Sequence, residues 1–209
     1  MNKKTKIFKL TKNNSSKIAG ECAQIMKKGG VVIYPTETSY GIGCSVSDEK
    51  AIRKIYKIKN RQLKKPMAVI VSDLEMAKKY VKLDKVSLAL IKKFMPGPLT
   101  IITHKKKTIP PSLSKRGIAF RISGSEFARV MSKKLGKAIV STSTNIDEPE
   151  IYSSKKVILK FENKVDVIVD AGKLKRNKTS TIYNTLNGKI LRYGPVKVGE
   201  IKKILRDLE

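Results

Sequence analysis

The sequence predicts a single α/β domain whose twisted, mixed parallel and antiparallel sheet is flanked by helices. Short apolar runs typical of buried strands alternate with helical patterns along the chain, and no internal repeat is present. The turn signal Leu186-Asn187-Gly188 separates the last two expected strands, and such a hairpin requires antiparallel pairing. With 209 residues and 40% hydrophobic side chains, the chain can bury a substantial core.

The first half of the chain is expected to begin with a helix and a buried strand. Ser15 or Ser16 can cap the helix, and Gly29-Gly30 can end it. The apolar run 31–34 then predicts a strand that opens into a binding loop over 35–43, because proline, hydroxyls and glycines follow it. The elements expected next are a helix from about Ser47-Asp48, a strand at 67–71, helices at 74–80 and 86–94, and a strand at 99–103.

The second half continues the same alternation after the break at Met95-Pro96-Gly97-Pro98. Strands are expected at 118–122, 138–141, 165–169, 181–185 and 189–192, and helices at 126–135, 154–161 and 198–208. Residues 1–14 are expected to be a basic N-terminal segment, with the domain core over about 15–209.

The chain is strongly basic, with 46 Lys and Arg against 17 Asp and Glu, a net charge of +29 and a pI near 10.1. Such a field favours polyanions, either the phosphates of a nucleotide or a nucleic acid backbone. The lysines are spread over the whole chain, so a compositional bias explains the charge equally well.

Several familiar catalytic and targeting signals are missing. The chain has neither a Gly-x-x-x-x-Gly-Lys-Ser/Thr motif nor a Gly-x-Gly-x-x-Gly after the first strand. Its one histidine, His104, stands beside three lysines and supports no serine triad, and Cys22 and Cys44 lack the neighbours of a zinc site. No apolar run is long enough for a membrane helix or a secretory signal, so we expect a soluble, cytoplasmic protein without a membrane partner.

Hydroxyls, amides and fixed cations gather instead at the expected strand ends. This set suits a nucleotide with a charged co-substrate, because nucleotidyl transfer depends mostly on positioning and electrostatic stabilisation. We therefore expect a concave basic ligand cleft. Its candidate residues are the loop 35–43, Lys59, Arg61, Lys65, Arg121, the run 141–145, Ser180-Thr181 and Arg192.

An ordered series of short segments resembles the motifs of the YrdC-like threonylcarbamoyl-AMP synthases. Each segment is unspecific alone, but the ordered set covers nearly the whole chain and is specific. The segments are Pro35 to Gly43, Lys59-Asn60-Arg61 with Lys65-Pro66-Met67, Met95-Pro96-Gly97-Pro98-Leu99-Thr100, Phe120-Arg121-Ile122, Ser141 to Asn145, Thr179-Ser180-Thr181-Ile182 and Leu191-Arg192-Tyr193-Gly194.

The resemblance implies one YrdC-like domain over 1–209, in the short single-domain form, and a nucleotidyltransferase activity. L-Threonine, bicarbonate or CO2, and ATP carried with Mg²⁺ would give threonylcarbamoyl-AMP and pyrophosphate, with no tightly bound organic cofactor. The product would pass to a tRNA-modifying transferase complex that forms threonylcarbamoyladenosine next to the anticodon. Direct binding of tRNA or another RNA is a further expectation.

The resemblance also implies roles for individual residues. Arg121 would pair with the threonine carboxylate, while Lys59 and Arg61 would hold the triphosphate and act in catalysis. The other expected contacts are Thr36, Thr38, Ser141 and Ser180 for threonine, and Lys65, Ser143, Asn145 and Arg192, with Lys59 and Arg61, for ATP. No protein residue is expected to bind the metal.

The chain departs from the family pattern at two places, and one alternative function stays open. The run 146–149 replaces the Ser-Gly pair expected soon after Asn145, and 122–126 replaces the Pro and His expected after Arg121. The alternative is a non-catalytic basic protein that binds tRNA or double-stranded RNA. It explains the charge, but neither the ordered hydroxyl motifs nor an aromatic content of only 6%.

Overall fold

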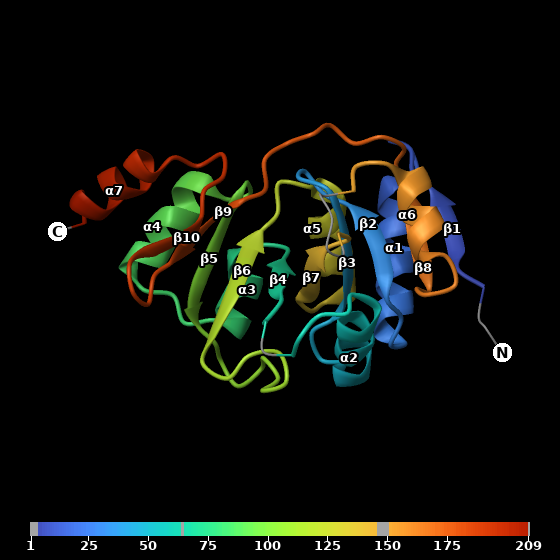
Figure 1. The fold of residues 1–209 in the computed structure, drawn as a ribbon. Coiled ribbons are helices and arrows are strands. Elements are labelled where there is room, and N and C mark those ends of the chain that lie inside the picture. The colour runs from blue at the N-terminus through green and yellow to red at the C-terminus, as the bar shows by residue number, and fades with distance from the viewer. Residues whose placement is uncertain (1–3, 64, 146–150, 209) are drawn as a thin grey trace.

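The computed structural model describes residues 4–63, 65–145 and 151–208. The strands in these ranges form one ten-stranded sheet in the order β1-β8-β2-β3-β7-β4-β6-β5-β9-β10, with helices packed on it (Figure 1). The strands are β1 (Lys6–Lys9), β2 (Val32–Pro35), β3 (Tyr40–Ser45), β4 (Ala68–Val71), β5 (Leu99–His104), β6 (Gly117–Ile122), β7 (Ile139–Ser143), β8 (Val167–Asp170), β9 (Thr181–Asn184) and β10 (Lys189–Arg192).

The helices follow the apolar periodicity of the sequence closely. They are α1 (Ser15–Lys27), α2 (Glu49–Ile58), α3 (Leu74–Tyr80), α4 (Lys85–Phe94), α5 (Glu126–Leu135), α6 (Ser154–Phe161) and α7 (Val198–Arg206). Asp48, Asp73, Asp84 and Ser125 cap the helices that follow them, each by accepting a hydrogen bond from a backbone N–H of the first turn. No helix within the described ranges has the length and apolarity to span a bilayer.

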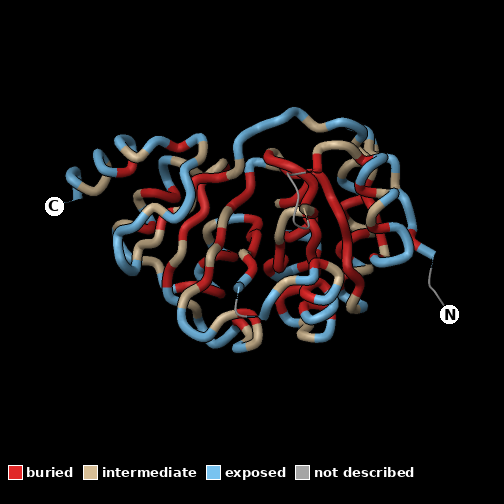
Figure 2. The backbone as a smooth tube through the Cα atoms, viewed as in Figure 1, coloured by how far each residue is buried: buried red, intermediate tan, exposed pale blue. Residues whose placement is uncertain are grey.

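The prediction of a mixed sheet is confirmed. Pairs β1–β8, β2–β8, β4–β6 and β5–β9 are parallel, whereas β2–β3, β3–β7, β4–β7, β5–β6 and β9–β10 are antiparallel. The segment 171–180, which we call the strap, runs from β8 near one edge of the sheet to β9 near the other (Figure 1). Figure 2 shows this strap mostly exposed, in contrast to the buried strands at the centre of the sheet.

Two strands were not predicted from the sequence. The first, β1, lies inside the segment 1–14 that we expected outside the core, and it pairs in parallel with β8. Three of its four side chains are exposed, so its sequence carries no apolar alternation that would signal a strand. Its anchor is Thr5, which is buried and donates a 2.6 Å hydrogen bond to Val165 O.

The second missed strand is β3, and the prediction of one loop over 35–43 is wrong at Pro35, which ends β2, and beyond Ser39. Only residues 36–39 form a turn, after which β3 pairs with β2 on one side and β7 on the other. The glycines of this stretch, with its proline and hydroxyls, predict a loop because glycine is depleted in strands. A Cβ at Gly43 would lie 2.6 Å from the carbonyl oxygen of Val140 on β7, so this glycine instead allows close approach of two strands.

Replacing Gly43 with alanine is therefore expected to lower the free energy of unfolding by about 3 kcal/mol, because the neighbouring atom is backbone and cannot move aside cheaply. Urea unfolding of the two proteins measures the difference. Gly199→Ala on α7 is the matched control, since no heavy atom lies within 4 Å of its added carbon. Equal stability of both variants would contradict this account of β3.

The two faces of the sheet are covered by different helices. On one face, α1 and α5 pack together over the region of β8, β2 and β7. The opposite face carries the larger core cluster, which includes residues of α2, α3, α4, α6 and α7. Side chains alternate between the faces, so on β4 Val69 and Val71 enter the larger cluster while Ile70 faces the α1 side.

Candidate active site

A cavity of about 870 Å³ opens on the side of the sheet that α1 and α5 cover only in part. Its lining includes Ala68 and Ile70 of β4 together with Ala119 and Arg121 of β6, the alternate residues of two neighbouring parallel strands. The volume lies in the range of small-molecule sites, roughly 300–1,000 Å³. The cavity can therefore hold a nucleotide-sized ligand.

Every residue to which the family resemblance assigns a role lines this one cavity, whereas Thr144 and Thr181 of the wider candidate set do not. The residues with an assigned role are Thr36, Thr38, Lys59, Arg61, Lys65, Arg121, Ser141, Ser143, Asn145, Ser180 and Arg192. Five of them are lysine or arginine, and none of the described lining residues is an aspartate or glutamate. The cavity is thus suited to anionic groups.

The turn 36–39 is built by the hydroxyl of Thr36. Thr36 Oγ1 donates to Ser39 O at 2.6 Å and accepts from the backbone N–H groups of Thr38 and Ser39, both at 3.2 Å. Thr38 Oγ1 lies 3.1 Å from Thr36 Oγ1. Because its hydroxyl is committed to the turn, Thr36 shapes the cavity wall, and of the hydroxyl or backbone contacts expected for it the backbone contact is the one left available.

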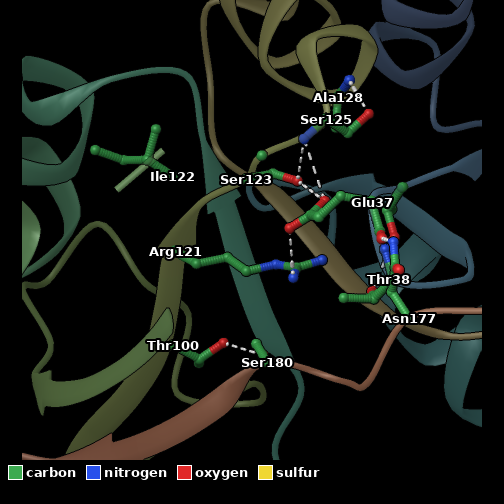
Figure 3. A network of polar contacts seen from close by, with 12 residues as sticks. Glu37, Thr38, Thr100, Arg121, Ile122, Ser123, Ser125, Ala128, Asn177 and Ser180 are labelled. Atoms are coloured by element: carbon green, nitrogen blue, oxygen red, sulfur yellow. Dashed lines mark hydrogen bonds and ion pairs between the residues drawn. The ribbon is translucent and has the colours of Figure 1, made fainter. Parts of the chain in front are cut away.

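Arg121 is held by a carboxylate that the sequence analysis did not single out (Figure 3). Its Nη1 donates to Glu37 Oε1 at 2.9 Å, while Ser123 Oγ and Ser125 N donate to Glu37 Oε2 at 2.6 and 3.2 Å. Among the described residues, the other guanidinium nitrogens of Arg121 have no protein partner. They are therefore available to a ligand in the cavity that Arg121 lines.

The surroundings of Glu37 keep its carboxylate charged. Burial raises the pKa of Glu37, but the charge of Arg121 and the hydrogen bonds from Ser123 and the backbone outweigh burial, and the net pKa is below the ordinary value. A Cβ at Gly124 would lie 3.2 Å from Glu37 Cγ, so the small residue makes room for this side chain. The departure from the family pattern after Arg121 thus supplies the donors and the space for Glu37.

Lys59 is buried, with 7% exposure, and its ammonium holds the carboxyl end of β7. Lys59 Nζ donates to the backbone oxygens of Ser143, at 2.6 Å, and Asn145, and lies 3.4 Å from Asn145 Oδ1. A hydrogen bond from Ser143 Oγ to Asn145 Oδ1 completes the cluster. The altered run 146–149 lies outside the described residues.

Arg61 and Lys65 form a second cationic element that is more open to solvent. Arg61 Nε donates to Lys65 O at 2.8 Å and Arg61 Nη2 donates to Pro66 O at 3.0 Å, so the guanidinium holds the backbone of the segment that leads into β4. Lys65 is exposed at the cavity wall. These two hydrogen bonds explain the spacing between Arg61 and the Lys65-Pro66 segment of the basic motif.

Ser180 is fixed by two neighbours on the far wall. Arg192 Nε donates to Ser180 O at 2.8 Å and Arg192 Nη2 to Ser180 Oγ at 2.9 Å, while Thr100 Oγ1 lies 2.8 Å from Ser180 Oγ. A Cβ at Gly194 would lie 2.3 Å from Thr179 O, so this glycine lets the end of β10 approach the strap. Arg192 therefore holds Ser180 in place, and its side chain also lines the cavity beside that serine.

Comparison with known proteins places these features in a family. The family model Sua5/YciO/YrdC, described as "Telomere recombination", matches residues 24–194. A Methanocaldococcus jannaschii protein provisionally named threonylcarbamoyl-AMP synthase is 35% identical over 208 residues, which cover 97% of this chain and 98% of the relative. A Chromobacterium violaceum threonylcarbamoyl-AMP synthase is 33% identical over 182 residues, covering 85% and 93% of the two chains.

Among solved structures, P. abyssi Sua5 complexed with L-threonine superposes with a TM-score of 0.90 at 26% identity. The match covers 96% of this chain but only 61% of that one, so this chain spans about three fifths of the length of the archaeal structure.

Proposed function

The chain belongs to the Sua5/YciO/YrdC family, and on that premise we propose that it is an L-threonylcarbamoyladenylate synthase, a nucleotidyltransferase. Its substrates would be L-threonine, bicarbonate or CO2, and ATP with Mg²⁺, and its products threonylcarbamoyl-AMP and pyrophosphate. The relatives named for this activity and the threonine complex of a related fold support the proposal. The observation that carries it is one cavity that combines a rigidly held arginine, hydroxyls and separate cations.

The reaction needs positioning more than acid–base groups. The neutral amine of threonine adds to CO2 and loses a proton to water, which gives a carbamate, and a carbamate oxygen then attacks the α-phosphorus of ATP. A phosphorus–oxygen bond forms to the carbamate, and the bond to the bridging oxygen of pyrophosphate breaks. The protein has to align the two substrates, exclude water and stabilise the charge on the leaving group.

We assign these tasks to different parts of the cavity. Arg121, fixed by Glu37, offers its remaining N–H groups to the threonine carboxylate as a planar fork. Ser141, Ser180 and the turn that carries Thr36 and Thr38 surround the amino acid. Lys59, Arg61, Lys65, Ser143, Asn145 and Arg192 are assigned to the nucleotide, with Lys59 and Arg61 stabilising charge during turnover.

Magnesium would enter on the phosphates of ATP. Mg²⁺ prefers oxygen ligands and keeps several waters, and no cluster of carboxylates, histidines or cysteines suited to a metal occurs among the described residues. Downstream, the unstable mixed anhydride would pass to a transferase that acts on tRNA in the cytoplasm.

Threonine- and bicarbonate-dependent release of pyrophosphate from ATP by the purified chain tests the proposal. We expect release above a control without threonine, and formation of threonylcarbamoyl-AMP in the same reaction. No release under conditions in which an established family member is active would refute the activity.

The RNA-binding alternative is not favoured. It accounts for the net charge of +29 but gives no reason for the convergence of hydroxyls around Arg121. A steep fall of tRNA affinity with salt would show only attraction to the backbone, because counterion release dominates such binding.

A further inference from the structure

Tyr34 is a fully buried residue that connects three strands below the cavity. It lies on β2 opposite Gly41 of β3, and Gly43 of the same strand lies opposite Ser141 of β7. An added Cβ would lie 3.6 Å from Tyr34 Cζ at Gly41, and 3.2 Å from Tyr34 Cε1 at Gly43. The ring therefore crosses β3 over Gly41, where an added Cβ would make an ordinary contact, and over Gly43, where an added Cβ would crowd it.

The phenol ends at the hydroxyl of Ser141. Tyr34 Oη donates to Ser141 Oγ at 2.7 Å, and this is the only hydrogen bond of the Ser141 side chain among the described residues. Burial raises the pKa of Tyr34 above its ordinary value of 10.0, although the hydrogen bond with Ser141 and the charge of Arg121 oppose the shift. The phenol consequently stays protonated at neutral pH and keeps the proton that it donates to Ser141.

The direction of this bond fixes what Ser141 can offer. A serine hydroxyl has one O–H donor and two acceptor lone pairs, and Tyr34 occupies one lone pair. Ser141 is only 8% exposed, lines the cavity and has no acceptor for its own proton within the described ranges. Its O–H is therefore available to donate to an oxygen of a ligand in the cavity.

We propose that Tyr34 is a positioning residue that holds Ser141 Oγ so that its proton points at a carboxylate or carbamate oxygen of the amino-acid substrate. The inference rests on the proposed function, because it needs an oxyanion of the amino acid at this wall. Tyr34 does not line the cavity, so it acts only through Ser141. This also gives Gly43 of β3 a second role, since a Cβ at that position would crowd the ring of Tyr34.

A double-mutant cycle tests the inference. Tyr34→Phe removes only the hydroxyl, and we expect kcat/KM for threonine to fall about fivefold to tenfold while KM for ATP stays unchanged. Ser141→Ala should lower kcat/KM for threonine at least as much. In the double variant, the loss should equal that of Ser141→Ala alone, because Tyr34 has nothing left to position.

Tyr80→Phe is the matched control. The Tyr80 hydroxyl is likewise engaged inside the protein, where it accepts from Ala138 N at 3.1 Å, but Tyr80 does not line the cavity. We expect its kcat/KM to match the wild type, although its melting temperature is lowered to a similar extent. This comparison separates positioning from a general loss of stability.

If the wild-type protein turns over threonine, three results in the variants would overturn the inference. They are multiplicative losses in the double variant, an equal loss in Tyr80→Phe, and an unchanged kcat/KM for threonine in Ser141→Ala. An unchanged kcat/KM in Ser141→Ala would overturn the inference even when Tyr34→Phe does not fold. A wild-type protein without threonine-dependent release would instead refute the proposed function itself, and the inference with it.

Discussion

Replacing Arg121 with alanine is expected to lower kcat/KM for threonine at least a hundredfold. The substitution removes the fork for the substrate carboxylate and leaves Glu37, whose side chain is only 20% exposed, without its positive partner. Breaking a buried pair in this way costs roughly 3–5 kcal/mol in comparable cases, and part of that cost falls on stability. Initial rates at varied threonine and saturating ATP measure the change in kcat/KM, and urea unfolding measures the change in stability.

Arg129→Ala is the matched control for this prediction. Arg129 lies on α5 beside the same segment, where its Nη1 donates to Ser123 O at 2.6 Å and Gly124 O at 3.0 Å, but it does not line the cavity. It should keep kcat/KM for threonine within about twofold of the wild type, since its contacts stop at the backbone. A comparable loss in both variants would show that the segment, and not the guanidinium of Arg121, matters for threonine.

Lys59→Met is expected to lower turnover tenfold or more and to destabilise the protein by about 2 kcal/mol. Methionine keeps much of the side-chain volume but leaves the carbonyl oxygens of Ser143 and Asn145 without the ammonium that now binds them. Turnover falls because the end of β7 loses its anchor and the cavity loses a cation. Single-turnover rates of pyrophosphate release and urea unfolding measure the two effects.

Two comparisons sharpen this result. Arg61→Ala should also lower turnover about tenfold if it stabilises phosphate charge, but with a smaller loss of stability because Arg61 is only half-buried. Lys57→Met, at the exposed end of α2, should change neither quantity. Unchanged turnover in both Lys59→Met and Arg61→Ala would move phosphate binding to other lysines.

Most of the fold could be predicted because its elements follow simple periodicities. Helices such as α3 and α5 combine an apolar face with a capping Asp or Ser, and the sequence gives their bounds as the structure has them. The strand β1 has neither signal, since its side chains are largely exposed and its pairing partner lies about 160 residues away. In β3, close packing of strands required glycines that local propensity assigns to a loop.

The cavity residues could be predicted because they lie in ordered motifs. The residues that hold them in position, such as Glu37 and Tyr34, could not be predicted. Glu37 meets Arg121 across 84 positions of sequence and Tyr34 meets Ser141 across 107. No local pattern encodes such contacts, because only the folded sheet brings the strands together. The same holds for Lys59, whose burial against the end of β7 is invisible in a basic motif at a helix end.

The pairing of β3 with β7 makes the site sensitive to the register of its strands. Ser141 and Ser143 lie opposite Gly43 and Gly41, and side chains alternate between faces at each residue. One residue inserted into β7 ahead of Ser141 would turn both hydroxyls away from the cavity and bring core side chains to its surface. The site therefore depends on the length of β7 ahead of Ser141 as well as on the identity of its residues.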